Sequence, residues 1–245
     1  MPPMTTQTQT FTDPLMFDLP ADLQSLRDEC LALHKFPRGA MPEDTIAVAN
    51  AWAQHTEDEP WAIWKARRFA ARLDALPVPL SPGEILIGKP QLIDGELPAE
   101  TTARLEAAHK TLETMPNDPG GDLGHFHPDY AVMFKRGVGG TLEEIRERRA
   151  GTDDPEKIVF YDSCEMAMQA FGDFILKLAG DCEAMIATDA ERAETWTKLA
   201  DICRTIAVDA PTTFHEAIQL MNLIMLAAWY AEDHGQANYG RMDQT

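Results

Sequence analysis

The sequence predicts a mainly α-helical globular protein. Apolar residues recur three and four positions apart over most of the chain, which is the spacing of one face of a helix. Prolines and glycines gather in short stretches between these segments, where they end regular structure. Of the 245 residues, 44% are hydrophobic and 25% are charged, as in globular proteins that bury a core. One large domain or two small ones would fit this length.

The elements follow from this pattern in chain order. Helices are expected over residues 23–33, 46–52, 61–76, 98–114, 130–138, 141–149, 160–182, 191–207 and 214–230. The apolar run 85–88, bounded by glycines, predicts a short buried strand, and the proline- and glycine-rich stretch 115–124 predicts a loop. The stripe from Phe160 to Cys182 is the clearest amphipathic pattern, so that helix should face the core.

The last helix, residues 214–230, is apolar on nearly every face. Thr213 and Glu216 form a capping-box pattern at its start. The segment is too short to span a bilayer, and Gln219 and Asn222 interrupt it. A helix that is apolar all round belongs inside a large protein, so we expect the part that covers it to lie beyond Thr245.

Charge and cysteine content exclude several classes of protein. The formal net charge of -19 and the isoelectric point near 4.6 disfavour nucleic acid and anionic membranes as partners. The N-terminus lacks the pattern of a secretory or organellar signal, which indicates a cytoplasmic protein. Cys30, Cys164, Cys182 and Cys203 lie far apart without a C-x-x-C pair, so we expect reduced, structural thiols.

Four segments, in order, resemble the pyruvate formate-lyase domain of glycyl radical enzymes. Residues 67–88 are similar to its arginine-rich helix, proline turn and P-x-E-L-I-V-G strand. The segment G-H-F-H-P-D-Y at 124–130, with the glycines of 137–140, is similar to its G-H-x-x-P-D-Y and G-x-x-G pattern. Residues 208–219 resemble its P-A-x-T-F-x-E-A-L-Q helix start, and G-R-M-D-Q at 240–244 resembles its G-R-x-D-Q turn.

This resemblance implies a fold and a chemistry. The fold is a ten-stranded α/β barrel around a cysteine loop and a glycine loop, and this chain would be its N-terminal portion. Residues 1–20 are then a flexible N-terminus, and residues 21–245 an incomplete domain. In the family the thiyl cysteine and radical glycine lie downstream of the G-R-x-D-Q turn, so no catalytic residue is assigned here.

The complete protein, by the same resemblance, is an anaerobic lyase that cleaves C–C, C–O or C–N bonds of a small-molecule substrate. It is expected to act as a homodimer. No cofactor is expected to bind directly. A partner enzyme that uses an iron–sulfur cluster and S-adenosylmethionine would install the glycyl radical, so the chain by itself is expected to be inactive.

His125 is the first candidate substrate-binding residue, because a glycine-rich loop lets a ligand approach closely. In true pyruvate formate-lyases the matching position is an arginine that grips a carboxylate. Histidine lacks that planar, always-charged fork and suits a substrate hydroxyl, so pyruvate is not the expected substrate. The alternative is a loop histidine whose ring is satisfied by backbone groups.

The turn after the last helix supplies the other candidates, Gln236, Asn238 and Arg241. By resemblance it approaches the substrate cavity, where polar side chains could contact hydroxyls or carbonyls. The alternative is that Gly235, Asn238 and Gly240 simply form a turn.

Two other functions stay open at this point. One is a non-catalytic helical module that binds another chain through the exposed face of the last helix. The other is a metal hydrolase built on His125 and His127, which two ligands alone do not make. His109, Asp122 and Asp129 would have to complete such a site, so no metal is expected.

Overall fold

The computed structural model of the chain describes Gln24, Ser25, Arg27, Asp28 and residues 41–81, 83–93, 95–116, 127–232 and 237–240. The chain divides into two compact units, Met1–Pro37 and Arg38–Thr245. The four described residues of the first unit are helical. The predicted helix 23–33 otherwise lies outside the described residues, as do the predicted flexible N-terminus and most of the predicted loop 115–124.

The second unit is built from helices. Its described residues form α2 Pro42–Trp52, α3 Trp61–Ala75, α4 Ala99–Leu112, α5 Tyr130–Ala150, α6 Pro155–Thr188, α7 Ala193–Ile206 and α8 Phe214–Tyr230, with a 3-10 turn at Ala190–Arg192 before α7. These same residues contain no strand beyond single bridges at Ile93 and Ala237. The prediction of a mainly α-helical chain is therefore confirmed.

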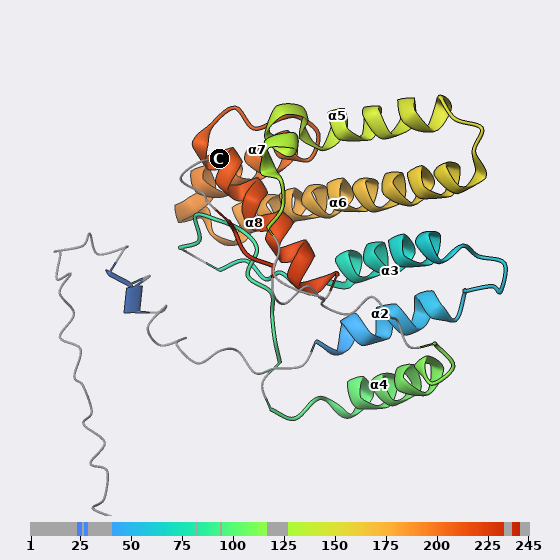
Figure 1. Cartoon of the computed structure of the whole chain (residues 1–245). Helices are drawn as coiled ribbons and strands as arrows, with labels where there is room; N and C mark the ends of the chain where they lie inside the picture. Colours follow the sequence, from blue (N-terminus) through green and yellow to red (C-terminus); the bar gives the residue numbers. More distant parts are fainter. Residues whose placement is uncertain are drawn as a thin grey trace, which may run out of the picture. The chain divides into compact units, whose positions relative to one another are not determined.

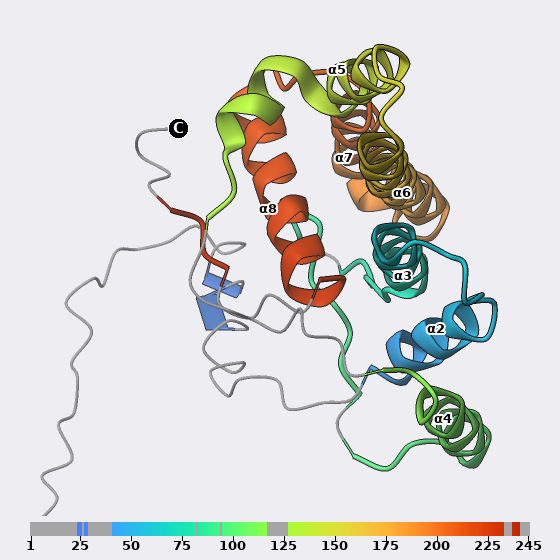
Figure 2. The ribbon, with the colours of Figure 1, turned by 45° about the vertical axis from the view of Figure 1, so that its right-hand side comes forward.

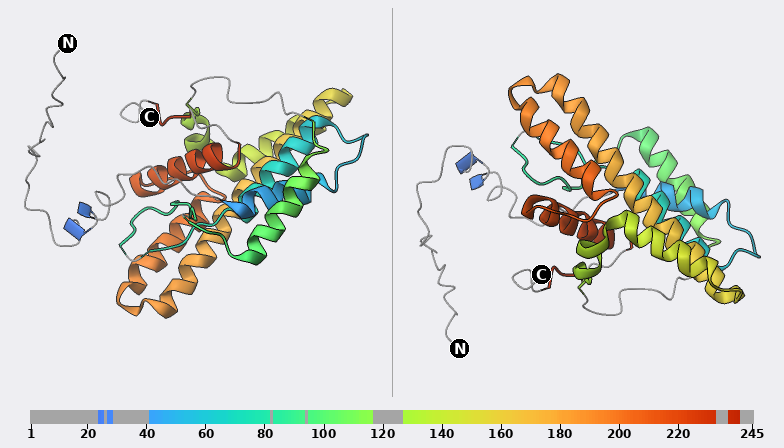
Figure 3. Two further views of the ribbon diagram at one scale, coloured as in Figure 1. Left: turned by 90° about the horizontal axis from the view of Figure 1, so that it is seen from below. Right: turned by 90° about the horizontal axis from the view of Figure 1, so that it is seen from above.

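Five helices lie side by side in one curved row, in the order α5, α6, α3, α2 and α4 (Figures 1 and 2). α7 packs along α6 as the second arm of a hairpin (Figure 3). α8 packs against α7 and α3 on one side of the row. The main core lies where α6, α7 and α8 meet residues 73–87.

Local sequence explains where the helices begin. The Asp154 side chain accepts hydrogen bonds from the backbone N–H groups of Glu156 and Lys157, and Pro155 occupies the first turn of α6. The capping box predicted at Thr213 and Glu216 is present at the start of α8. These contacts satisfy backbone donors that have no partner inside the helix.

α5 joins the two helices predicted at 130–138 and 141–149 and bends between them. The bend is at Gly137, whose φ of 67° favours glycine. A Cβ there would lie 2.4 Å from the backbone carbon of Asp209, and the Gly139 N–H donates to the Val208 carbonyl at 2.7 Å. The glycines of this segment therefore let α5 sit directly on the loop between α7 and α8.

The predicted strand at 85–88 is wrong: the segment is irregular, although Ile87 is fully buried. The Gln219 side chain forms the two hydrogen bonds that the backbone of a neighbouring strand would have formed. The Ile87 N–H donates to Gln219 Oε1 at 2.8 Å, and Gln219 Nε2 donates to the Ile87 carbonyl at 2.7 Å. A side-chain amide thus takes the place of a partner strand. The apolar sequence of this segment does not distinguish the two kinds of partner.

α8 buries most, but not all, of its apolar residues within this chain, and a cover from beyond Thr245 stays a prediction. Leu220, Leu223 and Leu226 are at most 2% exposed, whereas Ile224 and Trp229 remain half-buried. Neighbouring helices and the segments around 87 and 237 cover most of the α8 surface. The chain therefore buries more of this helix than its composition suggested.

The amphipathic stripe of α6 is also only partly core. Its later members, including Phe171 and Cys182, are buried, but Phe160 is 57% exposed. Phe160 lies instead in an open hollow of about 540 Å³ between α3, α5, α6 and α8. Met133 and Ile224 line the same hollow, which is almost wholly apolar.

Candidate functional site

The described parts of the family-like segments meet around one stretch of α8; of the fourth segment, residues 240–244, only Gly240 is described. The α8 side chains His215, Gln219 and Asn222 stand four and three residues apart, so they share one face of the helix. His215 Nε2 lies 2.6 Å from the Ile85 carbonyl oxygen. Together with the Gln219 bonds to Ile87, this contact fixes the end of the first segment to the helix that the third segment begins.

Asn222 connects the first segment with Tyr239, which directly precedes the fourth. Its Nδ2 donates to the Ile87 carbonyl at 2.8 Å, and its Oδ1 accepts from the Tyr239 hydroxyl at 2.9 Å. A Cβ on Gly88 would lie 2.6 Å from Asn222 Nδ2, and the φ of Gly88 is 131°. Only glycine lets the backbone approach the amide this closely.

Residues 237–240 close over α8 and meet the second segment. The Trp229 indole N–H donates to the Ala237 carbonyl at 2.9 Å. Gly240 has a φ of 61°, and a Cβ there would lie 3.1 Å from Cγ and Cδ2 of His127. The second and fourth segments, more than a hundred residues apart in sequence, are therefore in direct contact.

Tyr130 lies under this contact and is 3% exposed. It packs with Met221, Met225 and Ala237, and its ring stacks near Phe134 with centroids 6.1 Å apart. Within the described part of the chain its hydroxyl has no hydrogen-bond partner. Burial, with a smaller contribution from Tyr239, raises the pKa of Tyr130 to about 12, so the phenol is uncharged at neutral pH.

Of the predicted substrate-binding residues, the structure describes only Asn238. Its Oδ1 accepts from the Gly240 N–H at 2.9 Å, which is the turn-forming role that we weighed as the alternative. His125, Gln236 and Arg241 lie outside the described residues. The substrate-binding role of all four stays a prediction.

The residues weighed for a metal site are not assembled in the described part of the chain. There, no three His, Cys, Asp or Glu side chains stand together in a way that could hold an ion. Asp129 instead caps α5, since its side chain accepts from the Ala131 N–H at 3.1 Å. His125 and Asp122 lie outside the described residues.

The thiols are embedded in helices. Burial, the largest cause, raises the pKa of Cys182 and of Cys203 to about 12, and burial also raises that of Cys164. All three are free, and such thiols stay protonated at neutral pH. Cys30 lies outside the described residues.

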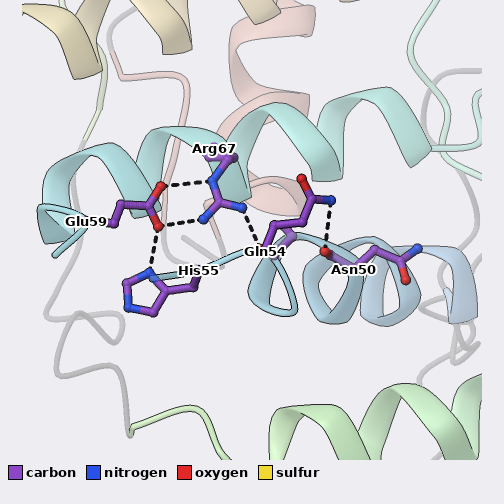
Figure 4. Close-up of polar contacts among 6 residues, drawn as sticks. Asn50, Gln54, His55, Glu59 and Arg67 are labelled. Atoms are coloured by element: carbon purple, nitrogen blue, oxygen red, sulfur yellow. Dashed lines mark hydrogen bonds and ion pairs between the residues drawn. The ribbon is translucent and has the colours of Figure 1, made fainter. Parts of the chain in front are cut away.

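Arg67, the first residue of the family-like segments, has a structural role (Figure 4). Its guanidinium donates to both carboxylate oxygens of Glu59, at 3.0 and 2.5 Å, and to the Ala51 carbonyl. His55 Nδ1 lies 2.6 Å from the same carboxylate, and its ring stacks on Trp52. This cluster holds the loop between α2 and α3.

Sequence reasoning missed the α8 side chains that organise the site. Gln219 and Asn222 were noted as interruptions of an apolar helix, and Gln219 also as the end of the third family-like segment. Polar amides inside an otherwise apolar, buried helix are themselves a signal, because a buried amide needs hydrogen-bond partners. Tyr130 was noted only as the last residue of the second segment, and Tyr239 carried no signal.

The arrangement is a helical scaffold on which the described parts of the four motifs meet around α8. The chain belongs to the pyruvate formate lyase-like family, whose model matches residues 91–245. This result confirms the family that the motifs indicated.

Similar proteins carry dehydratase names. A probable dehydratase of Escherichia coli (strain K12), YbiW, is 27% identical over 49% of this chain and 16% of its own length. A (2S)-3-sulfopropanediol dehydratase of Klebsiella oxytoca is 27% identical over 62% of this chain and 19% of its own. The chain thus spans less than a fifth of each of these relatives.

A solved structure shares the fold. It concerns 1,2-propanediol dehydration in Roseburia inulinivorans and superposes with a TM-score of 0.76 at 20% identity, covering 92% of this chain and 34% of that one. Separately, none of the described helices is long and apolar enough to cross a membrane.

Proposed function

We propose that this chain is the N-terminal part of a glycyl radical dehydratase or related lyase. The observation that carries the proposal is that the described parts of the family-like segments meet around α8, where Asn222 joins Ile87 of the first segment to Tyr239, next to the fourth. The dehydratase names of the relatives favour a substrate with a hydroxyl group over pyruvate. The helical part described here would belong to the N-terminal portion of the domain that contains the ten-stranded barrel.

In the proposed enzyme, a glycine and a cysteine supplied by the remainder of the domain carry the radical chemistry. The residues of this chain bind and orient the substrate. His125, Gln236, Asn238 and Arg241 are the proposed contacts, and the α8 amides hold the backbone segments around them. An activating enzyme that uses S-adenosylmethionine, a homodimeric assembly, a cytoplasmic location and anaerobic working conditions complete the proposal.

Electron paramagnetic resonance tests this proposal. The open reading frame continued beyond Thr245 should, after anaerobic incubation with an activating enzyme and S-adenosylmethionine, give the doublet of a glycyl radical and dehydrate 1,2-propanediol or a related diol. The 245-residue chain should give no doublet under the same conditions. A reading frame without a radical-bearing glycine loop, or a doublet from the 245-residue chain, would contradict the proposal.

One observation favours a second candidate, a helical module that binds another chain. The apolar hollow of about 540 Å³ beside α8 is open, and Phe160 stands exposed in it. A module of this kind needs such a surface and no radical residues. A stable complex of the chain with another protein, and no radical from the continued reading frame, would support this reading.

A further inference from the structure

Several polar side chains where the described segments meet α8 are hydrogen-bonded within the protein. His215, Gln219 and Asn222 contact backbone carbonyls of the segment 85–87, and Tyr239 donates to Asn222. The Tyr130 hydroxyl, enclosed beside them, has no hydrogen-bond partner among the described residues. The Tyr239 hydroxyl is thus hydrogen-bonded, whereas the Tyr130 hydroxyl is buried without a hydrogen bond.

A buried hydroxyl without a partner destabilises the folded state, because it has given up its hydrogen bonds to water and forms none in the protein. Phenylalanine would fill the same space beside Met221 and Met225 without this penalty. Such a group calls for an explanation outside the protein's own packing. Its place beside Tyr239 and Ala237, where the motifs meet, suggests a ligand.

We propose that the Tyr130 hydroxyl is a ligand-binding group that hydrogen-bonds to a hydroxyl oxygen of a small, neutral alcohol or diol. The assignment rests on the proposed function and adds a residue to it. Tyr130 is held for this role by α5 on one side and by Met221 and Met225 of α8 on the other. The ligand approaches from the side of residues 237–240.

The surroundings select a neutral hydroxyl over an anion. The side chains packed around Tyr130 include Met221, Met225 and Phe134, which are apolar. The uncharged phenol offers a carboxylate no countercharge, whereas a substrate hydroxyl can both donate to the phenol and accept from it. The net charge of the chain, -19, disfavours anions further.

A ligand can reach the Tyr130 hydroxyl if residues 237–240 move away from α8. Two side-chain hydrogen bonds hold residues 237–240 to α8, one from Trp229 to the Ala237 carbonyl and one from Tyr239 to Asn222. Short segments held in this way open at a small fraction of the free energy of global unfolding. A small alcohol can therefore reach Tyr130 without unfolding of the helices.

The test uses the 245-residue chain labelled with ¹³C at the tyrosine Cζ. The chain has four tyrosines, so single Tyr→Phe variants assign all four resonances. Titration with 1,2-propanediol should move the Tyr130 resonance saturably and leave that of Tyr161, in α6, in place. Tyr130→Phe should weaken binding, followed through backbone amides, roughly threefold to tenfold, the worth of one hydrogen bond. Tyr161→Phe is the matched control and should bind as the wild type does.

Urea unfolding supplies a second readout that does not depend on a ligand. Tyr130→Phe should keep or raise the urea midpoint, whereas Tyr239→Phe should lower it, because of these two hydroxyls only that of Tyr239 has a hydrogen-bond partner among the described residues. A static Tyr130 resonance, a response to acetate in place of the diol, or a lower midpoint for Tyr130→Phe would overturn the proposal. A glycyl radical from the continued reading frame would leave the proposed function standing in each of these cases.

Discussion

At the scale of the residue, close backbone contacts explain why the family-like segments have glycine where they do. Gly88 approaches the Asn222 amide and Gly137 approaches the backbone of Asp209, both at distances that no Cβ tolerates. Gly240 contacts the His127 ring less tightly, since a Cβ there would lie 3.1 Å from the ring, but its φ of 61° also favours glycine. The motifs thus encode the contact between segments as well as chemistry.

Gly88→Ala should destabilise the chain by about 1–3 kcal/mol, because it combines a strained backbone with a clash against Asn222. Urea unfolding measures the change. Gly180→Ala is the matched control: Gly180 is exposed in α6 and a Cβ there meets nothing within 4 Å. It should stabilise the chain by about 0.5–1 kcal/mol, because alanine is the better helix former. Equal effects of the two variants would refute the close contact.

Gln219 is the second residue on which the site depends, because its amide is fully buried. Gln219→Met keeps a similar volume but removes both hydrogen bonds to Ile87, so we expect a loss of about 1–3 kcal/mol. Gln169, whose side chain bonds Asp173 on the exposed face of α6, provides the control. Gln169→Met should change the free energy of unfolding by less than about 0.5 kcal/mol.

At the scale of the element, carboxylates with lowered pKa values hold two connections. Burial raises the pKa of Glu59, but hydrogen bonds from Arg67 and His55 outweigh it and bring the pKa below 4.5. Glu216 behaves likewise through Thr212 and Thr213. Such groups stabilise the folded state above their unfolded pKa, and this contribution is lost as the pH falls through the folded value.

Glu59→Gln should therefore destabilise the chain near neutral pH and lose less stability than the wild type on acidification. Urea midpoints between about pH 7 and pH 3 measure both effects. Glu57→Gln removes a charge from the exposed part of the same loop and should keep the wild-type curve. Parallel curves for Glu59→Gln and the wild type would show that the cluster in Figure 4 does not contribute.

The sequence predicted the positions of the helices well, but it did not predict which distant segments contact them. Caps and periodicity placed the helices, and the capping box at Thr213 located the start of α8 to the residue. The segment 85–88 was misread because an apolar run has the same composition whether its backbone pairs with a strand or with a glutamine. The contact of His127 with Gly240 joins distant segments, and no local pattern contains such information.

At the scale of the whole molecule, the unit Arg38–Thr245 is a row of helices with α7 and α8 packed against it. Leu220 and Leu223 of α8 are buried within the chain, so it has a core of its own. The apolar hollow of about 540 Å³ remains beside Ile224 and Phe160, where a further part of a domain or another chain would fit. The chain spans about a third of the solved relative that shares its fold.

The central claim is that α8 organises the converging segments, with the Gln219 amide acting as the backbone partner of Ile87. Native-state hydrogen exchange at the Ile87 amide tests it most directly, because no helix or strand protects that N–H. We predict that Ile87 exchanges as slowly as the core amides of α8, and that Gln219→Met accelerates exchange at Ile87 while α7 stays protected. Fast exchange at Ile87 in the wild-type chain would contradict the account.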